Sequence, residues 1–208
     1  MQIIELTISE ITKVYKEHLM RDFPRDEIKP LFVIKGHMKN QSYQAFGLFK
    51  SPSAFDAQDG TDSRPDLADL LAYAFLFGKP SGGLLLLDYF AVIPEARQQG
   101  IGSRFLEMLS QRISQSAGLA AEVESIRAAA DEKDRLARQR RLDFYLACGF
   151  RSTAVKGKIF GVDYDIVFRP LNSDWDSGIV RREIEKLYGS MMSKLMYKLN
   201  ISIMEDAR

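Results

Sequence analysis

The sequence has 208 residues, 46% of them hydrophobic and 11% aromatic, which suits one domain with a sizeable core and argues against a disordered chain. Lys and Arg number 29 against 28 Asp and Glu, and the formal net charge of +1 predicts no bulk attraction to nucleic acid or to an anionic membrane. The single cysteine, Cys148, excludes an internal disulfide and any metal site built from several thiolates, and two histidines leave little material for another metal site.

The sequence gives no sign of targeting or of membrane insertion. Its N-terminus lacks a basic segment followed by a long apolar run, which argues against a signal peptide. No apolar run approaches the roughly 20 residues that a membrane-spanning helix needs. Together with the single cysteine, these features predict a cytoplasmic protein without a bound metal.

The first part of the chain predicts a helix, a strand and a loop. Apolar residues recur at helical spacing in residues 9–22, so we expect a helix with Ser9 as its N-cap and an end just before Pro24. Residues 43–49 alternate aromatic or apolar with small residues, as a strand does. Residues 51–66 concentrate Ser, Asp, Gly and Pro, which is typical of a loop.

The middle of the chain contains the most apolar segments. Residues 67–77 fit either a strand or a helix, and the glycines of residues 78–83 interrupt the pattern. Residues 84–92 form a continuous apolar run with one charge, Asp88, which predicts a strand covered on both faces. An amphipathic helix is expected over residues 102–117.

Strands continue to alternate with helices up to about residue 168. Residues 119–126 read as a second core strand, and residues 131–147 as a helix closed by Gly149. Residues 150–155 and 162–168 are expected to form a terminal strand pair. This alternation predicts an α/β sheet domain.

The character of the sequence changes after Pro170, where we expect an extension (residues 171–208) to a domain of residues 1–170. Residues 177–200 are predicted to form one long amphipathic helix. Its apolar face must be buried, either on the chain's own domain or on a second copy, and a homodimer through this helix is favoured. The stripe that defines the face consists of Val180, Ile184, Leu187, Met191, Leu195 and Leu199.

A glycine-rich turn between the strand of residues 84–92 and the following helix predicts an anion site. The first N–H groups of a helix lack intrahelical partners, and the helix dipole adds partial positive charge there. Gly100 and Gly102 would let the backbone approach a pyrophosphate closely, with Arg97 and Ser103 as further donors. Phe105 rules out the full dinucleotide fingerprint, and on glycine spacing alone the turn fits equally well a tight connection that binds nothing.

Two short motifs resemble the signatures of the GCN5-related N-acetyltransferase (GNAT) superfamily over roughly residues 1–170. The first is Arg/Gln-x-x-Gly-x-Gly/Ala after a strand that ends in apolar-x-Val, and it stands here as Phe90-Ala91-Val92 followed by Arg97-Gln98-Gln99-Gly100-Ile101-Gly102. The second is Tyr-x-x-x-Gly-Phe after a later helix, and it stands here as Tyr145-Leu146-Ala147-Cys148-Gly149-Phe150.

The resemblance implies an acyl-CoA N-acyltransferase fold: a mixed central sheet, splayed at the cofactor strand and flanked by helices, here with an extra C-terminal helix. It implies acetyl-CoA as the acyl donor and direct attack by a primary amine, on a small molecule or a protein lysine. The backbone of Phe90, Ala91 and Val92 would pair with the pantetheine arm, and an N–H near Phe90 would polarise the thioester carbonyl. The residues expected to hold the pyrophosphate are Arg97, Gln98, Gln99, Gly100, Ile101, Gly102 and Ser103.

Tyr145 is the predicted general acid, because a phenol within hydrogen-bond range can protonate the leaving thiolate. The alternative is a core aromatic residue like its neighbours Phe144 and Phe150. Cys148, with no histidine nearby in the sequence, is expected to serve packing.

Three carboxylates compete for the role of base. Asp88 shares a strand face with Phe90 and is a candidate base or amine anchor, or else a partner in a structural ion pair with an arginine of residues 138–141. Glu122 and Glu124 share a face of the next strand, and Glu124 is favoured as a solvated strand end. Family members often carry a glutamate where this sequence has Leu86, which leaves the identity of the base open.

Two further alternatives stay open at the level of sequence. The basic run Arg135, Arg138, Arg140 and Arg141 fits a solvated helix face better than a nucleotide-phosphate site. A non-catalytic acyl-CoA-binding regulator, whose C-terminal helix contacts a partner, is the alternative to the enzyme.

Overall fold

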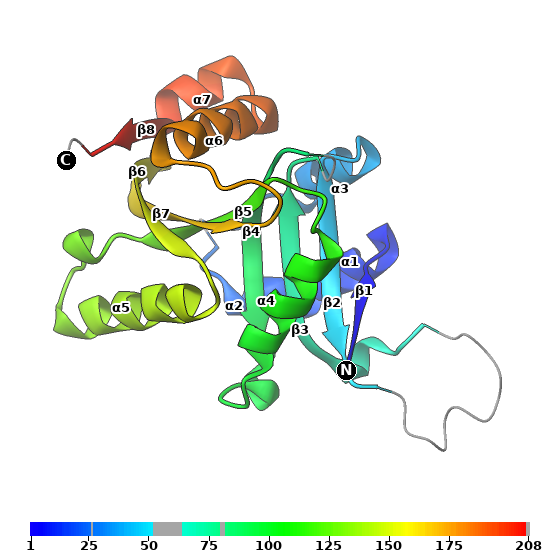
Figure 1. The fold of residues 1–208 in the computed structure, drawn as a ribbon. Coiled ribbons are helices and arrows are strands. Elements are labelled where there is room, and N and C mark those ends of the chain that lie inside the picture. Colours follow the sequence, from blue (N-terminus) through cyan, green and yellow to red (C-terminus); the bar gives the residue numbers. More distant parts are fainter. Residues whose placement is uncertain (26, 52–63, 80–81, 207–208) are drawn as a thin grey trace. The chain divides into compact units, whose positions relative to one another are not determined.

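The computed structural model describes residues 1–25, 27–51, 64–79 and 82–206 (Figure 1). Its strands form one mixed sheet in the order β1-β2-β3-β4-β5-β7-β6-β8 with flanking helices, which confirms the predicted fold class. The chain divides into two compact units, Met1–Leu76 with Tyr89–Leu109, and Phe77–Asp88 with Ser110–Arg208. The boundary predicted at residue 170 stays a prediction.

The strands of the first unit carry its core. β1 (Gln2–Glu5) pairs antiparallel with β2 (Tyr43–Phe49), whose bounds match the predicted strand. β3 (Leu70–Phe77) settles the ambiguous apolar segment as a strand. Most of its side chains are buried, which explains why it reads as a continuous apolar run rather than an alternation. The last residues of β4 (Leu84–Val92) complete this unit, and β4 also has the predicted bounds.

The first helix begins two residues earlier than predicted. α1 (Ile8–Val14) is capped by Thr7 rather than Ser9, because Thr7 and Glu10 form a capping box. Glu10 Oε2 accepts the Thr7 N–H at 2.7 Å, and Thr7 Oγ1 accepts the Glu10 N–H at 3.3 Å. The chain continues as a π-helical turn, Tyr15–Leu19, and as α2 (Met20–Asp22). It ends at the extended Phe23, before Pro24, as expected.

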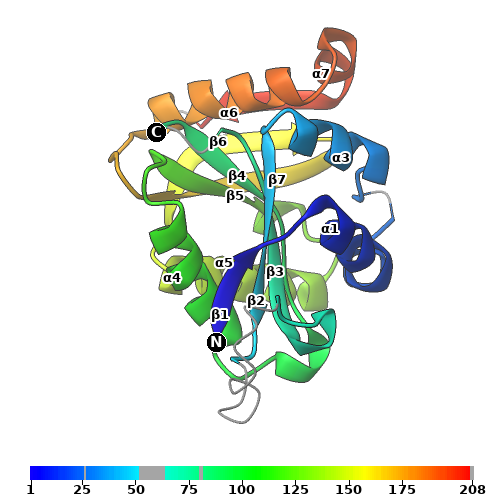
Figure 2. The same ribbon diagram turned by 90° about the vertical axis from the view of Figure 1, so that its right-hand side faces the viewer.

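Two other helices belong mainly to the first unit. α3 (Leu31–Lys39) follows Pro30 and was not anticipated by the sequence reading. α4 (Ile101–Arg112) begins at the glycine-rich turn and ends five residues before the predicted boundary at residue 117. Figure 2 shows α4 on one side of the first unit's strands and α1 and α3 on the other. The predicted loop of residues 51–66 lies mostly outside the described residues.

The second unit contains the remaining strands. β5 (Gly118–Glu124) pairs antiparallel with β7 (Val162–Pro170), and β7 pairs antiparallel with β6 (Arg151–Ile159). This confirms the predicted pairing of the last two strands, which extend beyond the predicted bounds. α5 (Glu132–Ala147) also confirms its prediction, and its N-cap is Asp131.

The prediction of one long C-terminal helix is wrong. α6 (Ser177–Met191) and α7 (Lys194–Asn200) are separate, and β8 (Ile201–Glu205) then pairs antiparallel with β6. The break lies at the extended Met192 and at Ser193, whose hydroxyl accepts the Met196 N–H as the N-cap of α7.

The apolar face of α6 is covered within its own unit, by β6 and β8. The side chains of Val180, Ile184, Tyr188 and Met191 are buried there. The main reason for expecting a second copy over this face therefore disappears. A homodimer through the C-terminal segment stays a prediction that rests on α7, where Leu195 and Leu199 are exposed.

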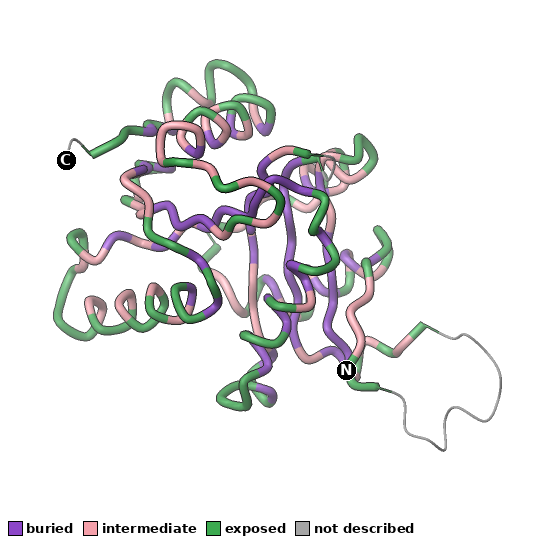
Figure 3. Tube along the Cα trace, in the orientation of Figure 1, coloured by how far each residue is buried: buried purple, intermediate pink, exposed green. Residues whose placement is uncertain are grey.

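Burial follows the strands of each unit, as Figure 3 shows in purple. In the first unit, the fully buried Tyr73, Phe75 and Phe49 are among the largest core side chains. In the second unit, Phe168 stacks on Trp175 with an interplanar angle of 3° and is fully buried. Each unit therefore has aromatic side chains packed against its own strands.

Candidate functional site

The ladder between β4 and β5 is short. It pairs Leu84–Leu87 in parallel with Gly118–Ala121, whereas β4 continues to Val92. β5 remains paired on its other edge, through Glu124 opposite Tyr164 of β7. These paired residues of β4 and β5 all belong to the second unit, and the splay at the cofactor strand stays a prediction.

The end of β4 leads into a compact turn in the first unit. A 3₁₀ turn, Pro94–Ala96, follows Ile93, whose N–H donates to the Leu71 carbonyl of β3 at 2.9 Å. Gln98 and Gly100 then have φ values of 61° and 72°, in the left-handed region. The Arg104 N–H donates to the Gly100 carbonyl at 3.1 Å, so the helical hydrogen bonds begin at Gly100.

The geometry of this turn suits an anion. Gly100 has the backbone conformation that side chains rarely adopt, and a Cβ placed there would meet no atom within 4 Å. Open space therefore lies beside the first turn of α4, where N–H groups have no intrahelical partners and the dipole favours negative charge. Gly102 is buried and Ser103 is exposed at this helix start.

Arg97 turns back toward the strand. Its Nε donates to the Val92 carbonyl at 3.0 Å, and its Nη2 lies 3.7 Å from Oδ1 of Asp22. Gln99 also bonds within the turn, from Nε2 to the Glu95 carbonyl at 3.1 Å. Two of the residues predicted to hold the pyrophosphate, Arg97 and Gln99, thus form side-chain hydrogen bonds within the turn.

The predicted cofactor strand residues lie at the same end of the unit. Phe90, Ala91 and Val92 are half-buried. Phe90 stacks on Phe105 of α4 with ring centroids 5.9 Å apart, which ties the strand to the helix that follows the turn.

Tyr145 lies near the end of α5 in the second unit, in a Schellman cap. The Phe150 N–H donates to the Tyr145 carbonyl and the Gly149 N–H to the Leu146 carbonyl, both at 3.1 Å. Gly149 has a φ of 81°, which the cap requires. The rings of Tyr145 and Phe150 pack edge to face at 5.1 Å. The Tyr-x-x-x-Gly-Phe motif therefore has a local structural basis, whatever its chemical role.

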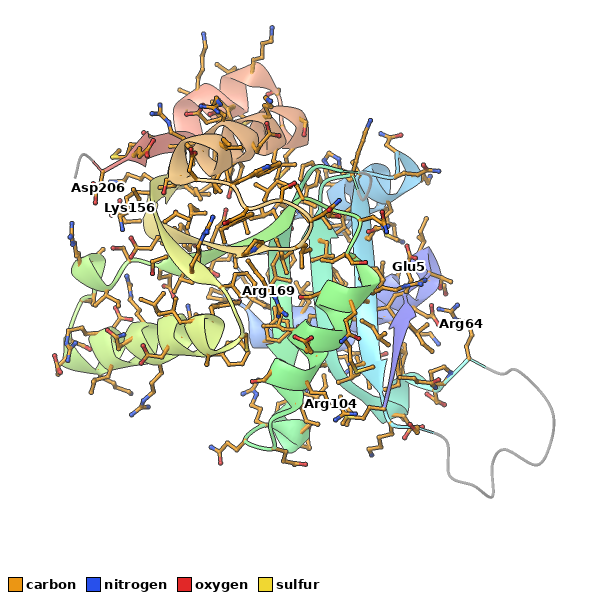
Figure 4. All side chains as sticks on the ribbon, viewed as in Figure 1. Glu5, Arg64, Arg104, Lys156, Arg169 and Asp206 are labelled. Carbon is orange, nitrogen blue, oxygen red and sulfur yellow. The ribbon has the colours of Figure 1, made fainter. Side chains whose placement is uncertain are left out.

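The environment of Tyr145 keeps its hydroxyl protonated. The side chain is buried, and burial raises the pKa of Tyr145 to about 12 although Arg141 opposes the shift. The end of α5 is also held by Arg169 of β7, labelled in Figure 4, whose Nη1 donates to the Cys148 carbonyl at 2.8 Å. Cys148 is buried, as expected of a packing residue.

The carboxylates proposed as bases differ in their surroundings. Asp88 and Glu122 are half-buried, and Oε1 of Glu122 is enclosed away from solvent. Glu124 instead forms ion pairs with Arg141 and, at 3.6 Å, with Arg138. Glu124 is therefore a structural carboxylate.

The basic run on α5 is engaged within its own unit. Arg138 donates from Nε to Asp134 at 2.9 Å and from Nη1 to the Ser125 carbonyl at 2.8 Å. Arg135 forms a two-pronged pair with Glu132, both bonds being 2.7 Å. The contacts of Arg135 and Arg138 favour the helix-face interpretation of the run over the nucleotide-phosphate site.

The predicted site residues divide between the two units by role. The cofactor set, residues 90–92 and 97–103, belongs to the first unit. Tyr145, Asp88 and Glu122 belong to the second. The structure brings the cofactor set together at one strand-to-helix turn.

The first unit also contains features that the sequence reading missed. Asp22 and Tyr73 lie beside Arg97 and are hydrogen-bonded to each other at 3.0 Å. A cavity of about 740 Å³ adjoins the turn, and Glu95, Ala96 and Gln99 form part of its wall. Neither feature has a local sequence signature, because its residues come from distant segments. Basic and acidic side chains line the cavity in equal number: Lys13, Arg21 and Lys50 against Glu17, Asp66 and Glu95.

The described residues contain neither a candidate membrane span nor a candidate metal cluster. None of the helices placed by the structure is long and apolar enough to cross a membrane. No group of three or more His, Cys, Asp or Glu side chains in the described ranges is arranged to hold a metal ion. The cytoplasmic location stays a prediction.

Comparison with known proteins supports the fold. The sequence matches no protein-family model and no curated protein sequence. A protein from Bacteroides thetaiotaomicron assigned to the GNAT acetyltransferases aligns with a TM-score of 0.61 and 18% identity, over 96% of this chain and 98% of that one. Spermidine N-acetyltransferase from Vibrio cholerae, solved with CoA and spermine, aligns at 0.56 and 10% identity over 83% and 96%.

The ribosomal-protein-S18-alanine N-acetyltransferase from Escherichia coli aligns with a TM-score of 0.50 and 19% identity, over 84% of this chain and 96% of that one. Identities this low establish a shared fold. The chain therefore has the GNAT fold, as the two sequence motifs predicted.

Proposed function

We propose that the chain is an N-acetyltransferase that transfers an acetyl group from acetyl-CoA to a primary amine. The observation that carries this proposal is the left-handed Gly100, with open space beside it at the start of α4. A turn of this shape on the GNAT fold suits a pyrophosphate held by backbone N–H groups. The N–H groups that would hold the pyrophosphate all belong to one short stretch of sequence.

The residues present fit acetyl-CoA. The N–H groups at the start of α4 would hold the pyrophosphate, and the backbone of residues 90–92 would pair with the pantetheine arm. When bound, acetyl-CoA would supply an acetyl group activated as a thioester, with a thiolate as the leaving group. A backbone N–H near Phe90 would stabilise negative charge on the thioester oxygen.

Tyr145 supplies a proton donor. With a pKa raised to about 12 by burial, its hydroxyl is protonated at neutral pH. Complete proton transfer to a thiolate with an ordinary pKa of about 8.5 would be uphill by roughly 5 kcal/mol. The raised pKa therefore argues against complete proton transfer, and Tyr145 would act by donating a hydrogen bond to the sulfur as negative charge develops there.

The base is proposed to be Asp88 or Glu122. Each is a half-buried carboxylate on a strand of the second unit, and burial suits a group that must accept a proton from an amine. Glu124 is less suited because its carboxylate already forms ion pairs with Arg138 and Arg141. Substrate amines of different size remain candidates: the neighbours named above act on spermidine and on a ribosomal protein.

A non-catalytic acyl-CoA-binding regulator is the second candidate. It is favoured by Leu86, a fully buried apolar residue where family members often carry a glutamate. Both candidates predict acetyl-CoA binding, and only the enzyme predicts release of free CoA in the presence of an amine.

Calorimetry and a thiol-release assay test the proposal together. The protein should bind acetyl-CoA and release CoA with an amine panel that includes a polyamine, an amino sugar and a lysine peptide. Gly102→Glu should weaken binding strongly, because it adds bulk and negative charge at the helix start. Gly36→Glu, at an exposed position of α3, controls for the added negative charge, and urea unfolding of Gly102→Glu controls for the bulk added at a buried position. Equal binding by parent and Gly102→Glu would refute the proposal that residues 97–103, here called the phosphate turn, hold the pyrophosphate. Binding without CoA release would favour the regulator.

A further inference from the structure

A buried carboxylate lies beside the phosphate turn. Asp22 is the last residue of α2, and its side chain is only 4% exposed. Its Oδ2 accepts a hydrogen bond from the Tyr73 hydroxyl at 3.0 Å, and its Oδ1 accepts one from Arg21 Nε at 3.1 Å. A carboxylate this enclosed is costly unless donors and cations compensate it, so these contacts fix its position.

Tyr73 attaches the Asp22 carboxylate to the core of the first unit. It lies on β3 and is itself fully buried in the core of the first unit. Burial and the negative charge of Asp22 raise the pKa of Tyr73, so its hydroxyl remains a donor to the carboxylate. Asp22 is therefore anchored to the sheet rather than to a mobile surface group.

Arg97 connects this anchor to the turn. Its Nε donates to the carbonyl of Val92, the last residue of β4, at 3.0 Å, while its Nη2 lies 3.7 Å from Asp22. A guanidinium presents its donors in a rigid planar fork, so one side chain can serve both acceptors. The Arg97 side chain thereby joins the turn to the end of β4 at Val92.

The turn beyond Arg97 needs such a support. Gln98 has a φ of 61°, which is uncommon for a residue with a side chain and persists only where neighbours over-determine it. Gly100 follows at 72° and sets the direction of the first N–H groups of α4. A displacement of Arg97 would therefore propagate directly into the backbone that faces the anion.

We propose that Asp22 is a positioning residue for cofactor binding: it holds the Arg97 guanidinium against the end of β4 and so fixes the phosphate turn. The cofactor part of this inference rests on the proposed function, whereas the effect on the turn does not. The clamp is defined as Asp22, Arg97 and the Val92 carbonyl, with Tyr73 as its support.

The clamp and a direct phosphate contact by Arg97 make opposite predictions. If Arg97 contributes only positive charge to the ligand, Arg97→Lys should bind acetyl-CoA like the parent. Asp22→Asn should then bind it more tightly, because a nearby negative charge has been removed. If the clamp operates, lysine cannot form the fork, and both variants should bind more weakly.

The first experiment measures acetyl-CoA dissociation constants by calorimetry for the parent, Asp22→Asn, Arg97→Lys, Arg97→Gln and the double variant Asp22→Asn/Arg97→Gln. Asp22→Asn should weaken binding a few-fold, the scale of a half-exposed ion pair. The two Arg97 changes should weaken it more, because they also alter the hydrogen bond to the Val92 carbonyl. The double variant should bind no more weakly than Arg97→Gln alone, because Arg97→Gln already removes the ion pair that Asp22→Asn removes. Parent-like binding by Arg97→Lys, or tighter binding by Asp22→Asn, would overturn the clamp.

The second experiment needs no ligand. Hydrogen exchange of the hydrogen-bonded amides that flank the turn, Ala96, Arg97 and Arg104, should be several-fold faster in Asp22→Asn and Arg97→Lys than in the parent. Unchanged exchange in Arg97→Lys would overturn the clamp even if the protein binds no acetyl-CoA. A parent that fails to bind acetyl-CoA would instead refute the proposed function, leaving the exchange result to decide the clamp.

Arg64→Lys is the matched control. Arg64, labelled in Figure 4 with Glu5, is 49% exposed against 53% for Arg97, and it also joins a carboxylate to a backbone carbonyl. It donates to Glu10 at 2.9 Å and to the Glu5 carbonyl at 2.7 Å. The control should change neither binding nor exchange at Ala96, Arg97 and Arg104. If Asp22→Asn fails to fold, Tyr73→Phe replaces it, and unchanged exchange in that variant would count against the clamp.

Discussion

Replacing Gly100 by alanine separates the shape of the phosphate turn from its ligand. The backbone at Gly100 has a φ of +72°, so a side chain there costs about 1 kcal/mol of folding free energy. No steric clash adds to this cost, because the new Cβ would meet nothing within 4 Å. The same methyl group would stand where the phosphates are proposed to approach the N–H groups. We therefore expect a small loss of stability and a loss of acetyl-CoA affinity of more than about tenfold, equivalent to at least 1.4 kcal/mol.

Gly161→Ala provides the matched control for this prediction. Gly161 has a φ of +87° in the turn between β6 and β7, and its Cβ would also meet nothing within 4 Å. Urea unfolding should show a similar loss of stability for both variants, and calorimetry should show weaker acetyl-CoA binding only for Gly100→Ala. Equal affinity in the two variants would refute the reasoning, because the open space at Gly100 would then not be the anion site.

Three further predictions concern protons. Tyr145→Phe should keep acetyl-CoA affinity and lower turnover by about one to three orders of magnitude, measured under single-turnover conditions; an unchanged chemical step would remove Tyr145 from the mechanism. In pH–rate profiles, either Asp88→Asn or Glu122→Gln should abolish the acidic limb, and the variant that does so identifies the base. Burial, and then Arg21, lower the pKa of His18 below 6.5, so the unfolded chain binds a proton first and unfolding free energy should fall as the pH drops below about 6.5. His18→Gln should flatten that dependence in denaturant titrations, and an unchanged slope would contradict it.

The strands were the most predictable part of the fold, because their patterns are local. β2 and β4 have the bounds that alternation and a continuous apolar run predicted. The start of α1 was misplaced because Ser9 is a good N-cap by residue type, whereas Thr7 has Glu10 three residues later and forms a reciprocal capping box. Residue type alone was therefore a poorer guide than the spacing of two partners.

The C-terminal helix shows where periodicity misleads. An apolar stripe at steps of three or four continues across Met192 and Ser193, although the helix does not. Ser193 can cap a new helix, and β8 gains a ladder with β6, so the tertiary pairing outweighs continuation of one helix. The stripe predicted burial correctly over α6 and could not show that the covering surface would be the chain's own strands.

The phosphate turn could also be predicted only in part from the sequence. Its glycines and the helix start are consecutive in sequence, so their use as an anion cradle can be predicted from local geometry. Arg97 belongs to the same motif, yet its partner Asp22 lies 75 residues earlier in the numbering and is placed by the end of α2 against β3. The positive charge of Arg97 led the sequence analysis to predict a phosphate contact. In the structure its guanidinium instead faces two internal acceptors, which supports a positioning role. Residue type therefore predicted the turn, and the packing around Asp22 is the observation that supports a positioning role for Arg97 over a phosphate contact.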